Sequence, residues 1–265
     1  DGTTVTNDVT GGRGAAANGN VVSLSNTHVN GAIMGGYGTA QSDGNTVSLQ
    51  NTAVNGAVTG GYGTATIGNT VNLKDATVHG AITGGHGTVQ SDANTISLQN
   101  ATVNGAVTGG YGTATNGNTI HLRNTVVNGI VTGGTASGGV GNTLAVYKPS
   151  EVHDFAGIQN LHFYTDEMAA GAATPMLKLG TATKDIRGLN IGVARSGAAP
   201  KLNKGDKILL MKTAGGALTT DAAIPNKVEG MQGVSRRYEY EIKQEATGEL
   251  TATVTKAGFA EQAKS

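Results

Sequence analysis

Residues 44–49 read GNTVSL and residues 54–65 read VNGAVTGGYGTA, and these two phrases make up one unit of a repeat. The asparagine of the first phrase recurs along the N-terminal half as Asn20, Asn45, Asn69, Asn94, Asn118 and Asn142. The spacings between these asparagines are 25, 24, 25, 24 and 24 residues. Units of this length, repeated without a helical period, predict a solenoid in which each unit forms one coil.

Each unit reads as strand, turn, strand, turn. The alternation around Val47 and Leu49 is typical of a strand with one buried face. The pair Asn55-Gly56 predicts a turn, because both residues tolerate a positive φ. The pair Gly60-Gly61 allows a bend or a close approach of backbone. The one-residue change in unit length falls after the second phrase, where a turn tolerates it and a strand does not.

Stacked coils would bring like residues together in columns through the interior. Four aliphatic rows are expected to fill it: Val22, Val47, Val71, Ile96, Ile120 and Leu144; Leu24, Leu49, Leu73, Leu98, Leu122 and Val146; Val29, Val54, Val78, Val103 and Val127; Ile33, Val58, Ile82, Val107 and Val131. Asn, Gly and Thr fill every unit and disfavour a helix, and a propeller blade needs about 40 residues. We therefore predict an all-β, parallel β-helix with coils of 24–25 residues, right-handed because parallel crossovers prefer that hand.

The chain divides into two regions by charge. Residues 1–143 hold three basic and five acidic residues, whereas residues 144–265 hold the other 15 basic and 13 acidic ones. Further strands are expected at 144–147, 161–164, 186–193 and 207–211, with a terminal hairpin at 238–242 and 250–254. We predict regular coils in the first region and wider, irregular coils with a C-terminal β cap in the second. Because Val5 and Val9 already match the repeat, we expect the natural solenoid to continue before residue 1.

The composition argues against several classes of protein. The formal net charge is zero and no basic face is apparent, so nucleic acid is not an expected partner. The absence of cysteine excludes a disulfide framework and a thiolate metal site. No apolar run is long enough for a transmembrane helix. No cofactor is expected, because Gly-rich stretches such as Gly133-Gly134 lack the lysine and helix of a phosphate loop.

The repeat copies, the segment Gly157–Tyr164 (GIQNLHFY) and the segment Leu202–Leu210 (LNKGDKILL) together resemble the passenger domains of monomeric type V autotransporters. The resemblance spans nearly the whole chain. It implies export across the outer membrane and display at the cell surface as a rigid, non-enzymatic stalk or adhesin, with roles in adhesion, aggregation, biofilm formation or virulence. It also implies that the last residues form an autochaperone-like cap.

The same resemblance implies the partners. They would be a surface protein or glycan of a host or bacterium, with self-association as a further option. In that family the membrane is reached only through a barrel domain that follows the passenger, and these 265 residues do not include one.

Two rows of polar side chains are candidate functional features. The asparagine row named above is expected to be a structural ladder, because stacked side-chain amides bond along the axis and satisfy turn backbone. The best candidate for a ligand-contact row contains rings that could stack on sugars: Tyr37, Tyr62, His86 and Tyr111. The competing interpretation of this row is a structural ladder beside glycine-rich turns.

Other functions find less support in the sequence. No pair of histidines has metal-ligand spacing, so no metal site is predicted. The row Thr59, Thr83, Thr108 and Thr132 is interrupted by Met34, which argues against an ice-binding array. No catalytic residues are predicted, and Asp43 and Asp92 are expected to be exposed turn residues. The alternative functions are a glycan-binding module that uses the aromatic row, or a glycan-active β-helix lyase or hydrolase with converging carboxylates in residues 144–265.

Overall fold

The structure, a computed structural model, describes residues 2–233 and 238–258, in which every regular element is a β-strand. The chain forms two compact units. The first comprises Asp1–Ala145 and Ser150–Asn160, and the second comprises Val146–Pro149 and Leu161–Ser265. The change of unit thus falls close to the predicted boundary at residue 143, although the first unit also takes in residues 150–160. Among the described residues, no helix long and apolar enough to cross a membrane is found.

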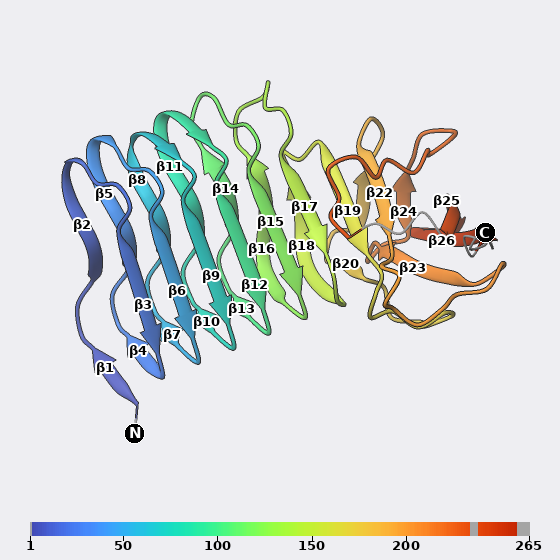
Figure 1. The fold of residues 1–265 in the computed structure, drawn as a ribbon, viewed down its shortest axis with the longest axis horizontal. Helices are drawn as coiled ribbons and strands as arrows, with labels where there is room; N and C mark the ends of the chain where they lie inside the picture. The colour runs from blue at the N-terminus through green and yellow to red at the C-terminus, as the bar shows by residue number, and fades with distance from the viewer. Residues whose placement is uncertain (1, 234–237, 259–265) are drawn as a thin grey trace, which may run out of the picture. The chain divides into compact units, whose positions relative to one another are not determined.

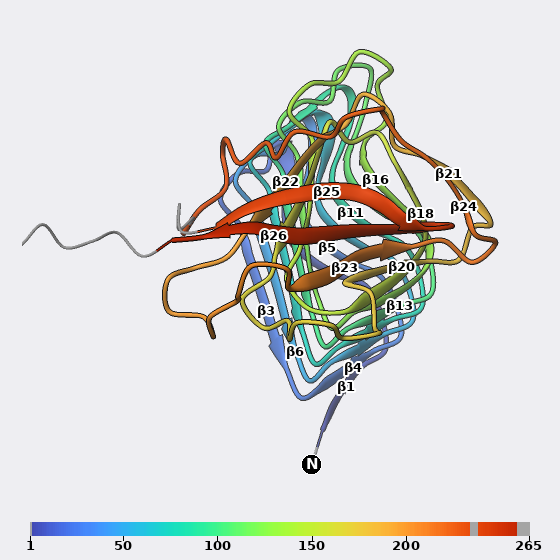
Figure 2. The same cartoon turned by 90° about the vertical axis from the view of Figure 1, so that its right-hand side faces the viewer.

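The first unit is a stack of coils that follow one another along the chain from blue to green in Figure 1 and lie behind one another in Figure 2. Its first face is built from β3 (Val21–Ser25), β6 (Thr46–Gln50), β9 (Thr70–Lys74), β12 (Thr95–Gln99), β15 (Thr119–Arg123) and β17 (Thr143–Val146). Its second face is built from β1 (Thr3–Val5), β4 (Thr27–Val29), β7 (Ala53–Val54), β10 (Thr77–Val78) and β13 (Thr102–Val103). Its third face is built from β2 (Val9–Ala16), β5 (Ile33–Gln41), β8 (Val58–Ile67), β11 (Ile82–Asp92) and β14 (Val107–Tyr111). In the last coils of the unit, β16 (Val126–Gly134) and β18 (Ser150–Ala156) each continue both the second and the third face.

Parallel pairing between coils places like residues in columns, as the repeat predicts. Leu49 is paired with both Leu24 and Leu73, and Leu73 is paired with Leu98. The other three aliphatic rows are in the same one-coil register, and nearly all of their members are buried. Each buried Val or Leu contributes about 1.5–3 kcal/mol relative to an exposed one. The predicted all-β parallel solenoid with coils of 24–25 residues is therefore confirmed.

The turns differ from the prediction in one respect. Asn55 and Gly56 do form a bend, but neither has a positive φ. Gly56 is needed for a different reason, because a Cβ there would lie 2.7 Å from the carbonyl oxygen of Gly31 in the preceding coil. Positive φ values occur at two other corners: at Asn26, Asn51, Asp75, Asn100 and Asn124, and at Gly19, Gly44, Gly68, Ala93, Gly117 and Gly141.

Ala93 occupies a corner at which every other coil of this series has glycine. Its φ is 53°, in the left-handed region that costs an L-residue with a Cβ roughly 1–2 kcal/mol. We expect Ala93→Gly to stabilise the first unit by about 1 kcal/mol, the relief of strain being partly offset by the greater freedom of glycine in the unfolded chain. Urea unfolding followed by circular dichroism would measure this. An unchanged or lower midpoint would show that the corner is unstrained.

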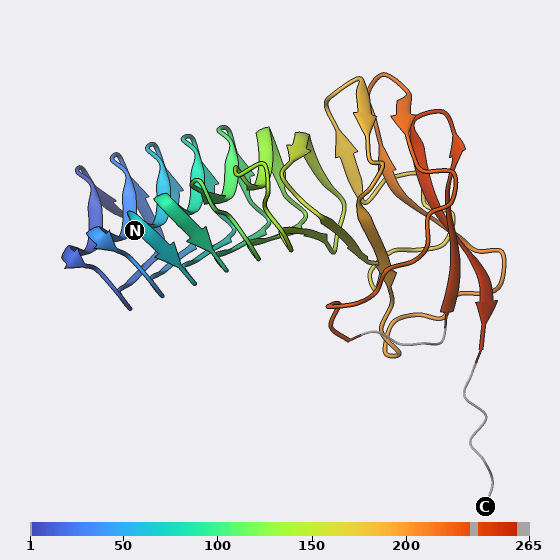
Figure 3. The ribbon, with the colours of Figure 1, turned by 90° about the horizontal axis from the view of Figure 1, so that it is seen from above.

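The Gly60-Gly61 pair allows the close approach that the sequence suggests. A Cβ on Gly60 would lie 2.4 Å from the carbonyl oxygen of Gly84 in the next coil. A Cβ on Gly61 would lie 2.7 Å from the side-chain amide of Asn69. Both glycines therefore face the interior, where they leave room for the asparagine row. Figure 3, which views the coils from above, shows the chain following a similar path from coil to coil.

The second unit has longer connections between its strands, which are β19 (Asn160–Tyr164), β20 (Leu177–Leu179), β21 (Thr183–Asp185), β22 (Asn190–Ala194), β23 (Lys207–Lys212), β24 (Ala217–Thr219), β25 (Tyr238–Ala246) and β26 (Glu249–Ala257). Its parallel pairs β20–β23 and β21–β24 join residues 34 apart, such as Leu177 with Met211 and Thr183 with Ala217, so these coils are wider than those of the first unit. The predicted terminal hairpin is present as antiparallel β25 and β26, side by side in Figure 2. The role of this region as a cap stays a prediction.

One predicted strand in the second unit is wrong in extent. Residues 186–193 do not form a single strand, because residues 186–189 make a turn in which Gly188 has a φ of 77°. The N–H of Leu189 donates to the carbonyl oxygen of Ile186, and the strand begins only at Asn190. The apolar residues on either side of the glycine therefore belong to two separate segments.

A buried arginine organises the second unit, and no pattern in the sequence indicates it. Arg195 is 2% exposed. Its guanidinium donates to the carbonyl oxygens of Thr165, Met168 (3.1 Å) and Pro200 (2.9 Å). A buried cation that satisfies several carbonyls holds separate loops together, because loss of the donor would leave those oxygens without partners.

Candidate functional site

The predicted aromatic row is assembled as one stack on the outer side of β5, β8, β11 and β14. The ring centroids of Tyr37 and Tyr62 lie 5.1 Å apart, those of Tyr62 and His86 4.8 Å apart, and those of His86 and Tyr111 4.4 Å apart. The planes are nearly parallel, at 3°, 22° and 22°. The guanidinium of Arg13 covers the first ring, 5.2 Å from the centroid of Tyr37.

This stacking limits what the row can bind. A sugar stacks on the flat face of an aromatic ring, but the faces within the row already cover each other or are covered by Arg13. Only the last ring, Tyr111, is largely open, at 48% exposed. The next coil places Thr135 beside it in register, and the hydroxyl of Thr135 donates to the carbonyl oxygen of Gly112. The geometry thus favours a structural stack, in which each ring pair contributes about 0.5–1.5 kcal/mol.

The predicted asparagine row is assembled as a continuous buried ladder. The backbone N–H and the side-chain Nδ2 of Asn45 both donate to Oδ1 of Asn69, at 2.9 and 3.0 Å. The same pair of bonds joins each asparagine to the next, from Asn20 to Asn142. The ladder ends on Oε1 of Gln159, at 2.9 and 3.1 Å from the same two nitrogens of Asn142.

The ladder keeps its hydrogen-bonding groups for the fold. In Asn69, Oδ1 accepts two bonds from Asn45, and Nδ2 donates to Oδ1 of Asn94 and to the carbonyl oxygen of Ser42. All the polar atoms of this side chain are thus used inside the protein, and Asn69 is fully buried. Asn69 is therefore a structural member of the ladder with no free group to offer a ligand.

Two further polar rows were not predicted from the sequence. One follows the positive-φ corner, where Asn51 donates to Asn26 at 2.6 Å and Asn100 donates to Asp75 at 3.0 Å. The other lies at the Asn-Gly bend, where Asn128 donates to Asn104 at 2.9 Å. Their regular spacing of 24–25 residues is visible in the sequence. What cannot be read from it is that exposed amides, like the buried ones, bond from coil to coil.

The expectation for Asp43 and Asp92 needs correction. Asp43 lies in the turn and Asp92 is the last residue of β11, and both are half-buried rather than exposed. The Oδ1 atom of Asp43 accepts the backbone N–H of Ile67, and that of Asp92 accepts the backbone N–H of Asn116, each at 2.8 Å. These carboxylates satisfy donors of the following coil, which accounts for their presence in a region with few charges.

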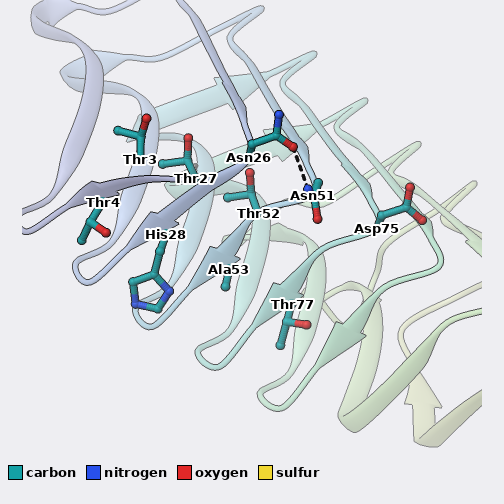
Figure 4. Close-up of a pocket in the computed structure, with 11 residues that line it drawn as sticks. Thr3, Thr4, Asn26, Thr27, His28, Asn51, Thr52, Ala53, Asp75 and Thr77 are labelled. Carbon is teal, nitrogen blue, oxygen red and sulfur yellow. Dashed lines mark hydrogen bonds between the residues drawn. The ribbon is translucent and has the colours of Figure 1, made fainter.

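An open groove of about 630 Å³ runs along the positive-φ corner of the first coils (Figure 4). Asn26, Asn51 and Asp75 line the corner, and His28 and Thr77 lie on the adjoining strands. Asp75 is the one carboxylate in this lining, and within the described parts of the chain no group of three metal-binding side chains gathers anywhere. The groove offers hydroxyl and amide groups but no converging set of charges.

His121 is the most strongly perturbed histidine of the first unit. Burial, together with the nearby charge of Arg123, lowers its pKa from 6.5 to about 4. The unfolded chain therefore binds more protons than the folded chain between pH 6.5 and pH 4, so stability must fall as the pH drops through this window. Above pH 6.5 the group has no such effect.

We expect His121→Ser to reduce this acid sensitivity, since Ser97 occupies the same row one coil earlier. The free energy of unfolding of the parent chain should drop by on the order of 2 kcal/mol more than that of the variant between pH 7 and pH 4. Urea titrations at several pH values would measure the difference. Parallel pH profiles for the two proteins would contradict the assignment.

The carboxylates of the second unit are largely engaged in surface ion pairs. Glu245 lies within ion-pair distance of Lys207, and Glu249 lies 3.1 Å from Lys212. The hydrogen bond from Arg187 lowers the pKa of Asp185 to about 2, and Lys207 lowers the pKa of Glu245. A general acid needs a raised pKa, so these shifts run opposite to what a glycan-active enzyme would require of these two groups.

The first unit thus presents a closed aromatic stack, a buried amide ladder and open polar grooves. Any function of the first unit has to be inferred from these three features. Comparison of the chain with protein-family models, with curated proteins and with solved structures found no match.

Proposed function

We propose that this chain is a non-enzymatic passenger domain of the autotransporter type, displayed at the cell surface as a stiff adhesive stalk. The observation that carries the proposal is the continuity of the first unit. Its interior consists of aliphatic columns and one amide ladder that runs unbroken from Asn20 to Gln159. Each coil adds ~4.8 Å of length and binds only its neighbours, so the unit serves as a spacer whose length is set by coil number.

The outer surface supports an adhesive role. The coils present hydroxyl and amide side chains in regular rows, and the repeat region carries few charges. Such a surface can make the same contact several times along its length, and repeated weak contacts add up to firm attachment. The residues that the sequence pattern shares with passenger domains support the surface location.

Surface display is tested by labelling cells that produce the full-length gene product with antibodies raised against the first unit. We expect intact cells to be labelled as strongly as permeabilised ones. Labelling that requires permeabilisation would rule out display.

Adhesion is tested with beads that carry the purified chain and are applied to cultured epithelial cells or to extracellular matrix. We expect attachment above that of albumin-coated beads. Beads with Lys204→Gln, a substitution at an exposed position of the second unit, should attach like the parent. Failure of the parent beads on every surface tried would contradict an adhesive role even if the protein is displayed.

A further inference from the structure

The outer side of β3, β6, β9, β12 and β15 carries a shallow trough of about 310 Å³. Its floor is a row of short side chains at Ser23, Ser48, Asn72 and Ser97. One wall is a row of longer side chains at Gln50, Lys74, Gln99 and Arg123. The one-coil register of the strands lines up both rows, so the trough runs along the axis of the solenoid. We refer to it as the serine trough.

The serine trough carries positive charge in a spaced pattern. Lys74 and Arg123 belong to its wall row, with Gln99 between them. They are therefore two coils apart, roughly 9–10 Å along the axis. No acidic side chain is among the lining residues. Asp75 follows Lys74 in the chain but lies on the corner, where it accepts a hydrogen bond from Asn100.

The chemistry of the lining disfavours a peptide ligand. The strands β6, β9 and β12 under the trough are paired on both sides with strands of neighbouring coils, so their backbone cannot accept an added strand, which is a common mode of peptide binding. The lining combines hydroxyl, carboxamide and cationic groups with three leucines, Leu24, Leu49 and Leu73. The polar groups in it can recognise the hydroxyls and anions of a ligand.

The pattern also disfavours nucleic acid. Single-stranded nucleic acids are held by several aromatic side chains that stack on bases, whereas the floor row continues beyond Ser97 with a single half-buried ring, that of His121. They also carry a phosphate on every nucleotide, whereas the trough has a cation only on every second coil. A polymer of hydroxylated units with an anion on alternate units fits both the floor and the wall.

We propose that the serine trough binds an extended acidic polysaccharide that carries one carboxylate or sulfate on every second sugar. The anions of alternate sugars meet Lys74 and Arg123, and the sugar hydroxyls exchange hydrogen bonds with Ser48, Asn72 and Ser97. This assignment deepens the adhesive function proposed above and rests on it for its biological setting. It places glycan binding on the serine trough and not on the aromatic row, whose rings cover one another.

The test measures binding of the purified chain to immobilised hyaluronan, which has one carboxylate per disaccharide, and to chondroitin sulfate. Dextran serves as the neutral glycan, and single-stranded DNA as a polyanion of another class. We expect binding to at least one acidic glycan that weakens with added salt, and markedly weaker binding to dextran and DNA.

The decisive variant is the double substitution Lys74→Gln and Arg123→Gln. Glutamine already occupies this row at Gln50 and Gln99, so the fold should be preserved. We expect the affinity for the acidic glycan to fall by roughly tenfold or more. The matched control, Lys204→Gln with Lys227→Gln, removes the same net charge from exposed positions of the second unit and should bind like the parent.

The assignment would be overturned by no binding to either acidic glycan at low salt, by equal weakening of binding in both double variants, or by DNA binding as tight as glycan binding. A thermal unfolding curve that matches the parent confirms that a loss of affinity in the variant is not a loss of fold. Bead attachment that persists in the Lys74/Arg123 variant would refute the trough while leaving the adhesive function intact. Glycan binding by a protein that is not displayed at the cell surface would support the trough and contradict the proposed function.

Discussion

Asn94→Ala is expected to destabilise the first unit by about 4 kcal/mol, which would leave a protein of ordinary stability largely unfolded in that region. Asn94 is fully buried. Its Oδ1 accepts the backbone N–H and the Nδ2 of Asn69, and its Nδ2 donates to Oδ1 of Asn118. Alanine removes these bonds and leaves buried donors of Asn69 unpaired, each at a cost of about 1–3 kcal/mol. A small cavity adds to the loss.

The measurement is urea unfolding followed by far-UV circular dichroism, with Asn128→Ala as the matched control. Asn128 also donates to an asparagine in the preceding coil, at 2.9 Å, but in an exposed row where water replaces the lost bond. We expect the control to change the free energy of unfolding by less than about 0.5 kcal/mol. Equal effects of the two substitutions would show that the buried ladder does not have the role assigned to it.

Gly84→Ala is the second substitution with a large expected effect, a destabilisation of about 3 kcal/mol. A Cβ at this position would lie 2.5 Å from the carbonyl oxygen of Gly109 and 3.0 Å from Cβ of Asn94. The added Cβ would have the backbone of Gly109 on one side and Asn94 of the ladder on the other. Neither of them can move without disturbing the stacking of coils. The coils would have to separate locally to admit the methyl group.

The matched control for this substitution is Gly138→Ala. A Cβ added to Gly138 would meet no atom within 4 Å, and this glycine has no positive φ. We expect its replacement to be neutral or slightly stabilising. Thermal unfolding of the two variants side by side would separate steric exclusion from the general effect of replacing a glycine. A Gly84→Ala protein as stable as the parent would mean that the third face is packed less closely than described.

The columns of like residues could be predicted from the sequence, because a repeat determines which residues are paired in successive coils. When Leu49 and Leu73 occupy the same place in consecutive units, stacking the units brings them together without any knowledge of the rest of the fold. The aromatic row could be grouped for the same reason. Its mutual occlusion follows from the rung spacing of ~4.8 Å, which leaves no room for a ligand between rings.

The Asn-Gly bend shows where the sequence was ambiguous. Glycine is required both where φ is positive and where backbone approaches closely, and Gly56 is compatible with either reason. Gly44, which does have a positive φ, is preceded by Asp43 and followed by a ladder asparagine, so its surroundings look equally turn-like. Only the three-dimensional path of the neighbouring coil separates the two cases.

The second unit could be predicted less well because it lacks repeats. A strand was predicted across Gly188 from its apolar residues, although the chain turns there. The burial of Arg195 depends on the carbonyl oxygens of Thr165 and Met168 in one turn and of Pro200 in another loop, and no local pattern brings those together. The serine trough was missed for a related reason. Lys74 and Arg123 are 49 residues apart, and their alignment appears only once the register of β9, β12 and β15 is known.

The stacking of coils in one-unit register is tested most directly by disulfide formation, for which the absence of cysteine provides a clean background. Ser23 and Ser48 are paired in adjacent coils, so their Cα atoms should lie ~4.8 Å apart, within the range that a disulfide spans. Ser48 and Ser97 are in the same row two coils apart, which is beyond the roughly 7 Å limit. We expect Ser23→Cys with Ser48→Cys to cross-link fully under mild oxidation, and Ser48→Cys with Ser97→Cys to keep free thiols. A reversed result, or equal cross-linking of the two pairs, would contradict the stacked solenoid.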